Sequence, residues 1–164
     1  MALDTPLVER LQASLGVEVG LSHGMPVLQL APAQVSGAVR TLRDRLGFDM
    51  LLDLTAVDWL AKQEPRFEVV WHFFATATQT RVRVKTRVAE SHPVVVSLTS
   101  LYGSAAFMER ECHEMFGVRF EGNADLRPIL LYEGFVGHPL RKDYPKDREQ
   151  PLIPYRDAGT GTPA

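Results

Sequence analysis

The sequence predicts an α+β fold: a mixed or antiparallel sheet covered by two or three helices, with a long extended C-terminal strap. Three observations predict it. Apolar residues recur at helical spacing in separate segments, strand-like apolar segments lie between them, and the last third is irregular and rich in Pro and Gly. We expect an α+β domain over residues 1–117, the strap over residues 118–157 and a frayed tail over residues 158–164.

Two helices and two short strands are expected at the start of the chain. The first helix ends at Gly16, and the strands follow at 17–19 and 27–30. The second helix begins at Pro32 and ends before Gly47, because proline suits a first helical position and glycine a C-terminal cap. Its apolar stripe consists of Val35, Val39, Leu42 and Leu46.

Three longer strands follow in the middle of the chain. Residues 48–57 are nearly continuous in apolar side chains, which predicts a central strand covered on both faces, and residues 67–75 are similar. Residues 80–88 alternate, which predicts one buried and one solvated face. Valines at 82, 84 and 88 alternate with Arg81, Arg83, Lys85 and Arg87. Residues 94–98 form a short strand or lead into the last helix.

The last predicted helix begins after Ser104 as N-cap and ends at Phe116, with Gly117 at the C-terminal cap. Four of its side chains are expected to face the core, namely Phe107, Cys112, Met115 and Phe116. Three are expected to stay in solvent, namely Glu109, Arg110 and Glu114.

Composition excludes several classes of protein. The chain of 164 residues is 45% hydrophobic and 23% charged, so it can bury a normal core. Its net charge of -2 gives no bulk attraction to nucleic acid or anionic lipid. The single cysteine excludes an intramolecular disulfide and a cysteine-built zinc site. No apolar run reaches the roughly 18 residues of a membrane span. We expect a cytoplasmic protein of bacterial type.

Candidate active-site residues do not form a complete set. His113-Glu114 begins like a zinc-binding helix, but Gly117 stands where the second histidine is needed, so metal binding is disfavoured. Asp49 and Asp53 share one face of the predicted strand 48–57, and Asp58 follows it. Paired carboxylates could act in acid–base chemistry, but hydrogen-bonded or edge-exposed aspartates are favoured because no nucleophile lies nearby in the sequence.

The cationic face of residues 80–88 has three interpretations. It could contact nucleic acid, but no aromatic residues interleave with the cations to stack on bases. It could instead be a solvated face that protects a sheet edge, or a protein interface. The solvated face is favoured.

The strap predicts a docking segment. Its prolines forbid a regular helix, and ordering about 40 residues costs roughly 1–2 kcal/mol each. At about 25 cal/mol/Å² this requires burial of roughly two thousand Å² of apolar surface, more than the strap's own domain can supply. Its apolar anchors are Phe120, Leu126, Ile129, Leu130, Leu131, Tyr132, Phe135, Leu140 and Tyr144. We therefore expect a large partner.

The segment from Glu109 to Pro145, which joins the last predicted helix to the strap, carries the signature of a known family. The matching segments are Glu109-Arg110-Glu111, Met115-Phe116-Gly117, Asp125-Leu126-Arg127, Ile129-Leu130, Gly134-Phe135 and the block from Gly137 to Pro145. The chain resembles the 30-kDa subunit of respiratory complex I, which in bacteria is the C subunit of NADH:quinone oxidoreductase. It departs from the family pattern at Gly122-Asn123-Ala124, at Pro128 and at Glu114.

The resemblance implies a subunit of the hydrophilic arm of a proton-pumping complex, with no cofactor, metal or catalytic residue of its own. FMN, the iron–sulfur clusters and quinone would belong to partner subunits. The partners implied are the quinone-site subunit, of the 49-kDa type, and the iron–sulfur subunits. The chain would lie on the cytoplasmic side of the bacterial inner membrane, peripherally and only through the complex.

The resemblance also implies a partner interface on the last helix and the strap. Its expected residues are Glu109, Arg110, Glu111, Arg119, Phe120, Asp125, Leu126, Arg127, Phe135, His138, Leu140, Arg141, Lys142, Asp143 and Tyr144. Three alternatives remain: a homologous subunit of a membrane-bound hydrogenase or formate hydrogenlyase complex, a free-standing enzyme that uses the aspartates, and a nucleic-acid binder that uses the cationic strand.

Overall fold

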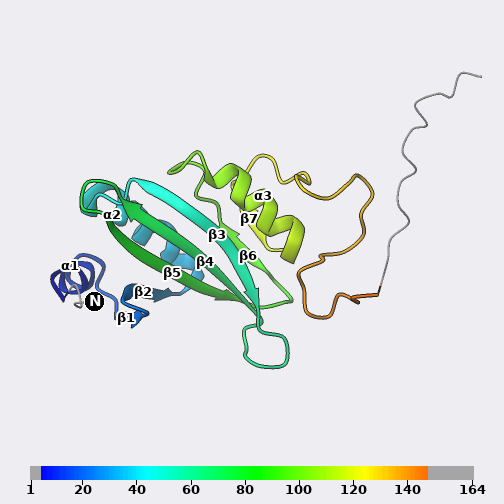
Figure 1. Ribbon diagram of the computed structural model, residues 1–164, viewed down its shortest axis with the longest axis horizontal. Coiled ribbons are helices and arrows are strands. Elements are labelled where there is room, and N and C mark those ends of the chain that lie inside the picture. Colours follow the sequence, from blue (N-terminus) through cyan, green and yellow to red (C-terminus); the bar gives the residue numbers. More distant parts are fainter. Residues whose placement is uncertain (1–4, 148–164) are drawn as a thin grey trace, which may run out of the picture.

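The computed structural model describes residues 5–147, so the frayed tail and residues 148–157 of the predicted strap lie outside the described residues. Helices, strands and a short 3-10 turn (η1) follow one another along the chain (Figure 1). In order they are α1 (Thr5–Leu15), β1 (Val19–Ser22), β2 (Met25–Leu30), η1 (Pro32–Gln34), α2 (Val35–Leu46), β3 (Met50–Asp58), β4 (Phe67–Ala75), β5 (Thr80–Val88), β6 (Val94–Val96), α3 (Ala105–Phe116) and β7 (Arg119–Glu121).

The predicted α+β class is confirmed, and the sheet is mixed. The strands of the main sheet lie in the order β1-β2-β5-β4-β3, with β2 and β5 parallel and the other pairs antiparallel. A separate two-stranded sheet pairs β6 with β7 in parallel. The predicted boundary after Gly117 assigns β7 to the strap, whereas in the structure these three residues pair with β6.

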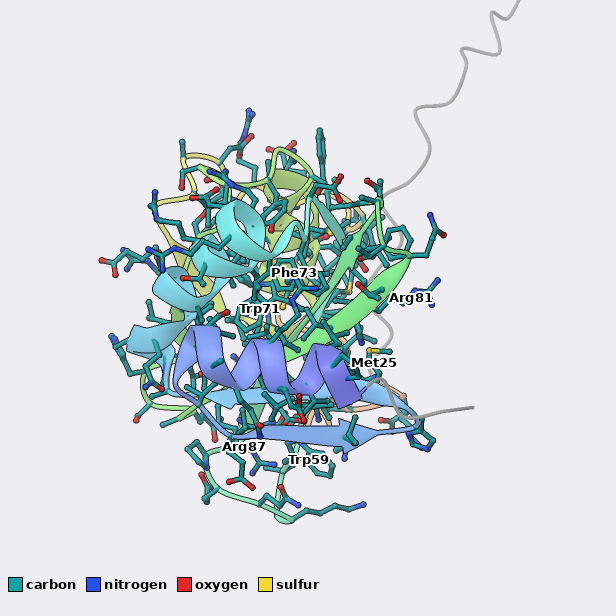
Figure 2. All side chains as sticks on the ribbon, turned by 90° about the vertical axis from the view of Figure 1, so that its left-hand side faces the viewer. Met25, Trp59, Trp71, Phe73, Arg81 and Arg87 are labelled. Atoms are coloured by element: carbon teal, nitrogen blue, oxygen red, sulfur yellow. The ribbon has the colours of Figure 1, made fainter. Side chains whose placement is uncertain are left out.

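The core lies on one face of the main sheet. Trp71 and Phe73 of β4 and Val82 and Val84 of β5 are completely buried, while the cations of β5 lie on the opposite face. Figure 2 shows Trp71 and Phe73 inside the molecule and Arg81 at its periphery. The predicted alternation of residues 80–88 is confirmed. The valines of β5 face the core, and the cations between them face the other side of the sheet.

The prediction that residues 48–57 form a central strand is wrong. β3 is an edge strand, and Met50 and Leu52 are exposed. The apolar character of β3 is explained by a helix, because α3 packs against this strand and Leu51 and Leu54 are buried. A bulge between Leu51 and Asp53 also shifts the alternation of faces.

Both longer helices end where the sequence predicts. Gly47 and Gly117 adopt left-handed φ values of 77° and 76°, a conformation that glycine reaches without steric cost. Ser104 makes no side-chain capping bond, and its hydroxyl instead donates to the carbonyl of Leu51 at 3.4 Å. Within residues 5–147, no helix is both long and apolar enough to cross a bilayer.

The two faces of β4 provide a matched test of this architecture. Phe73 is completely buried and contacts the ring of Tyr102 at 5.4 Å, whereas its neighbour Phe74 lies half-buried on the opposite face. We expect Phe73→Ala to lower the free energy of unfolding by about 3–5 kcal/mol, the usual cost of a core phenylalanine. Urea denaturation of Phe74→Ala should show a clearly smaller loss, and equal losses would contradict the assignment of faces.

Candidate partner-docking site

Glu114 of α3 holds the strap through its backbone. Its carboxylate accepts the N–H groups of Ile129 at 3.3 Å, Leu130 at 3.0 Å and Leu131 at 2.8 Å. Glu114 is therefore only 6% exposed, and the prediction that it stays in solvent is wrong. The strap folds over this face of α3, and its amides replace water around the carboxylate.

Arg110, one helical turn earlier, holds the adjacent strap carbonyls. Its guanidinium donates from Nε to the carbonyl of Arg127 and from Nη2 to the carbonyl of Pro128, both at 2.9 Å. Arg110 and Glu114 therefore bind consecutive parts of the strap, with a donor for its carbonyls and an acceptor for its amides. Figure 1 shows the strap passing along α3.

Glu109 has an internal role. Its side chain is completely buried and accepts hydrogen bonds from the amide of Leu98 at 2.7 Å, the hydroxyl of Ser97 at 2.8 Å and the side-chain amide of Asn123 at 2.9 Å. Burial raises the pKa of its carboxyl group, against the effect of these donors. The prediction that Glu109 stays in solvent is wrong, because the segments before and after α3 both donate hydrogen bonds to its carboxylate.

Phe107 is also placed differently from its prediction, since it is 62% exposed. The buried stripe of α3 follows helical spacing through Ala105, Glu109, Cys112 and Phe116. Phe107 lies off this stripe, so its expected core position is wrong.

The strap also satisfies the C-terminal carbonyls of α3, which have no partner within the helix. Leu140 donates its N–H to the carbonyl of Met115 at 3.2 Å, and Arg141 donates from Nε to the carbonyl of Phe116 at 2.7 Å. His138 Nδ1 lies 2.9 Å from the carbonyl of Glu114. A Cβ on Gly117 would meet His138 Nε2 at 2.6 Å, so glycine here leaves room for the strap.

Arg66 fixes the end of the described strap. Its guanidinium donates to Asp58 at 2.9 and 2.8 Å, to Asp143 at 3.0 and 2.8 Å and to Glu90 at 2.6 Å. These contacts use all five of its N–H groups, and its side chain is 3% exposed. The amide of Lys142 adds a bond to Asp58 at 2.8 Å. Arg66 thus joins the ends of two strands, the loop after β5 and the strap.

The aromatic residues of the strap pack on one another. The rings of Tyr132 and Phe135 meet edge to face at 5.5 Å, and Phe135 stacks on Tyr144 at 6.1 Å. Gly137 has a φ of 102°, and a Cβ there would lie 2.9 Å from the ring of Tyr144. This turn therefore requires glycine.

Several apolar side chains of the strap remain partly or largely exposed to solvent. The exposed fractions are 39% for Ile129, 64% for Leu130, 37% for Tyr132, 61% for Val136 and 53% for Leu140. The backbone of this segment is fixed on α3 while these side chains face solvent. Exposed apolar side chains gathered on one segment are typical of a protein interaction site.

The remaining expected interface residues fall into three groups. Phe120 is 1% exposed and lies in the chain's own core with Glu109. Asp125 forms a two-bond ion pair with Arg127 at 2.9 and 2.8 Å and lies 3.9 Å from Arg110. The remaining residues with exposed or half-buried positions are Glu111, Arg119, Leu126, Phe135, His138, Leu140, Arg141, Lys142, Asp143 and Tyr144.

The candidate aspartates are engaged separately. Asp49 accepts the amide and hydroxyl of Thr76 at 2.9 and 2.5 Å, Asp53 lies 3.3 Å from His72, and Asp58 pairs with Arg66. The bulge in β3 removes the predicted common face of Asp49 and Asp53. Hydrogen-bonded or edge-exposed aspartates, the favoured prediction, are confirmed.

His113 has a structural contact, with its Nδ1 3.0 Å from the carbonyl of Val118. Its ring meets the edge of the His138 ring at 6.4 Å. No group of three or more His, Cys, Asp or Glu side chains suited to a metal ion occurs among residues 5–147.

Sequence reasoning missed Arg66 and the internal roles of Glu109 and Glu114. Arg66 and Asp143 are 77 positions apart, and neither belongs to a pattern that indicates the other. Glu109 does fall on the helical spacing of the buried stripe with Cys112 and Phe116, and this position was the available signal. Glu114 lies on the opposite side of the helix, where only the strap covers it.

The fold and the strap define an α+β domain with a C-terminal extension anchored on its own last helix. The family model described as "Respiratory-chain NADH dehydrogenase, 30 Kd subunit" matches residues 28–150. The chain therefore belongs to this family of complex I subunits, and its partners are other subunits of that complex.

Curated relatives extend the match over most of the chain. The C subunit of NADH-quinone oxidoreductase from Trichlorobacter lovleyi is 39% identical over 148 residues, which cover 88% of this chain and 91% of the relative. The corresponding subunit from Roseiflexus castenholzii is 42% identical over 156 residues, 92% of this chain and 89% of the relative.

Solved structures share the fold. The trypsin-resistant fragment (1-134) of Nqo5 is similar with a TM-score of 0.65 and 28% identity, covering 74% of this chain and 97% of the fragment. A chain of an archaeal membrane-bound sulfane sulfur reductase reaches a TM-score of 0.77 over 86% of this chain and 85% of its own, with 24% identity, which shows the fold alone.

Replacing Glu114 tests the hold of α3 on the strap. We expect Glu114→Ala to leave three strap amides without their charged acceptor, each such bond contributing about 1.5–3 kcal/mol. Chymotrypsin should then cleave after Leu130 or Tyr132 at least tenfold faster, while far-ultraviolet circular dichroism stays unchanged. Glu111→Gln, an exposed neighbour on α3, is the control. Unchanged cleavage of Glu114→Ala would contradict this contact.

The Arg66 cluster predicts loss of the strap end in acid. Burial opposes ionisation of Asp58, but hydrogen bonds from Arg66 and from the amides of Lys142 and Leu60 outweigh it and lower its pKa to about 2. A lowered carboxyl pKa stabilises the folded state above about pH 4, and that contribution is lost as the pH falls toward 2. The amide of Lys142 donates to Asp58, so its protection against hydrogen exchange, relative to the intrinsic exchange rate at each pH, should decline over this window.

At neutral pH, Asp143→Asn should weaken only the attachment of the strap end to Arg66, because Asp58 still pairs with Arg66 within the domain. We expect faster trypsin cleavage after Arg141 and Lys142 without a change in the melting temperature of the domain. Asp147→Asn, an exposed change in the same segment, is the matched control. Equal cleavage of the two variants would show that Asp143 does not hold the strap.

Proposed function

We propose that this chain is a cofactor-free structural subunit of the hydrophilic arm of a proton-pumping NADH:quinone oxidoreductase. It braces the quinone-site subunit and the iron–sulfur subunits while electrons pass from NADH to quinone. The family and its named relatives support the complex. FMN, the clusters and quinone are held by the partners, on the cytoplasmic side of a bacterial inner membrane.

The observation that carries this proposal is that the strap's backbone is bound to its own domain while several of its apolar side chains are exposed. Its backbone is held by Arg110, Glu114 and the Arg66 cluster, while Leu130, Val136 and Leu140 face outward. A segment already fixed in its docked shape avoids most of the entropy cost of ordering on binding. Burying these half-exposed side chains would contribute about 1 kcal/mol each.

The exposed fractions support a different membership for the proposed interface. Glu109 and Phe120 serve the chain's own fold, and Ile129, Leu130 and Val136 join the partner surface. Arg127, Lys142 and the exposed Arg119 provide the charged rim that fixes register, which favours correct pairing more than raw affinity. The curated relatives favour the NADH-linked complex over a hydrogenase-type complex, since they are named NADH-quinone oxidoreductase subunits.

Two exposed leucines test the proposal. We expect the double variant Leu130→Asp/Leu140→Asp to fold normally, because both side chains point to solvent. Recovery of the other complex subunits with the tagged variant should fall more than tenfold, since each aspartate loses apolar burial and must be desolvated at the interface.

Met50→Asp is the matched control, because Met50 is 44% exposed on β3, outside the strap. It should retain the wild-type yield of the complex. Full recovery of the complex with the double variant would overturn the docking role of the strap.

A further inference from the structure

The main sheet has a second face, and within residues 5–147 no helix packs on it. Alternate residues of β2, β4 and β5 bring their side chains together there, since Val27 and His72 both pair with Arg83, and Gln29 and Val70 both pair with Lys85. The core side chains point the other way. This face, here called the cationic face, is formed chiefly by Arg81, Arg83, Lys85 and Arg87 of β5 and their neighbours on β2 and β4.

The carboxylates on this face neutralise only part of its positive charge. Glu68 is 3% exposed and accepts both Lys85 at 3.1 Å and Arg87 at 3.5 Å. One buried carboxylate therefore serves two cations. The aliphatic stems of such cations cover neighbouring apolar side chains, which keeps Val70 at 6% exposure although no helix covers it.

Arg81 and Arg83 have no carboxylate partner among the described residues. Arg81 lies over the ring of Phe74 at 5.7 Å, and Arg83 donates from Nε to His72 Nε2 at 2.7 Å. His72 in turn lies 3.3 Å from Asp53, so Arg83 reaches a carboxylate only through this ring. Burial and the charge of Arg83 lower the pKa of His72, which keeps the ring neutral at pH 7. Both guanidinium groups thus retain N–H donors that no described side chain accepts.

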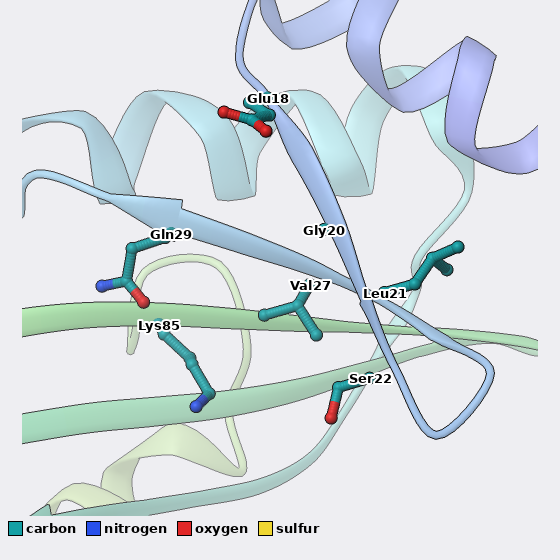
Figure 3. A pocket seen from close by; sticks show the side chains of 7 residues that line it. All are labelled: Glu18, Gly20, Leu21, Ser22, Val27, Gln29 and Lys85. Atoms are coloured by element: carbon teal, nitrogen blue, oxygen red, sulfur yellow. The ribbon is translucent and has the colours of Figure 1, made fainter.

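A hollow lies on the same side of the sheet, and Val27, one of its lining residues, pairs with Arg83. Its volume is about 380 Å³, and its walls come from β1, β2 and β5. Figure 3 shows Val27, Gln29, Ser22 and Lys85 around it, with Gly20 contributing no side chain. Glu18 is its single carboxylate-bearing residue. The hollow has room for side chains from a segment that crosses the sheet face.

We propose that the cationic face docks an acidic segment of a neighbouring subunit of the complex. Residues 81 and 83 project from one face of a strand about 7 Å apart, the spacing of alternate carboxylates on an extended chain. Each guanidinium would bind one carboxylate through two N–H groups. The segment would continue over the hollow, where Ser22 and Gln29 supply polar partners.

This inference rests on the proposed function only in that the partner is a subunit of the same complex. It adds a second docking surface, separate from the strap, through which the chain could contact a second subunit. The cationic face belongs to β2, β4 and β5, whereas the strap lies along α3 (Figure 1). A nucleic acid is disfavoured, because the aromatic rings on this face already contact its cations. Arg81 lies over Phe74, Arg83 donates to His72, and Arg87 lies over Trp59 of the loop after β3.

Zero-length cross-linking tests the chemistry of the partner directly. Arg81→Lys and Arg83→Lys preserve the charge and place a reactive amine on the cationic face of the assembled complex. Carbodiimide should join these positions to an Asp or Glu of another subunit at least fivefold more than it joins the position of Arg40→Lys, an exposed control on α2. Links no more frequent than the control, or only to Asp53 and Glu68 of the same chain, would overturn the proposal.

Charge reversal tests the contribution to binding. In the purified complex, Arg81→Glu/Arg83→Glu should at least halve the salt concentration that releases the chain, while Arg40→Glu/Arg45→Glu leaves it unchanged. If the reversed chain does not fold, Arg81→Gln/Arg83→Gln replaces it with the same expectation. Release at the wild-type salt concentration would overturn the proposal, whereas failure of the strap variants alone would bear only on the proposed function.

Binding to other polyanions provides the remaining outcome. The isolated chain is tested at 50 mM salt with single-stranded RNA and with vesicles of phosphatidylglycerol and phosphatidylcholine. We expect no binding to either that depends on Arg81 and Arg83. Binding to either that is lost in Arg81→Gln/Arg83→Gln would assign the cationic face to that anion and overturn the protein partner.

Discussion

The contact between Glu114 and three consecutive strap amides is the interaction on which the rest of this structure depends. A buried carboxylate requires donors, and an irregular backbone requires acceptors, so each satisfies the other. Arg110 provides the complementary contact to the preceding carbonyls. Because the polar backbone is satisfied by the chain's own helix, the apolar side chains of the strap are left for a partner.

Arg66 extends the same principle to the far end of the strap. A guanidinium that is almost fully buried is stable only when its donors are paired, and here three carboxylates pair with it. Arg66 and Arg141 also lie over the ring of Phe67, at 4.9 and 5.0 Å. The strap is thus joined to the sheet as well as to α3, and the proposed docking surfaces belong to one connected body.

Local regularities of the fold could be predicted from the sequence. The period of two located 80–88, and glycine marked the ends of α2 and α3, because these signals arise between near neighbours in the chain. The position of β3 at the sheet edge could not be predicted, since apolar runs look alike under a helix and between two strands. The three-residue β7 is too short for any periodic signal.

The site shows the same limit. Helical spacing indicated the burial of Glu109, but no local pattern indicated that Glu114 is buried or that Arg66 joins Asp143. These contacts depend on which segment folds back over which helix face. A charged residue on a helix looks solvated until the segment that covers it is known.

The central claim is that the strap is already fixed on its own domain before any partner binds. Hydrogen exchange of the isolated wild-type chain measures this most directly, at the amides of Leu130, Leu131, Leu140 and Lys142. The structure predicts exchange at least a hundredfold slower than in an unstructured peptide, because each amide donates to a described acceptor. Exchange at the unstructured rate at all four positions would contradict the claim and make ordering of the strap a consequence of docking.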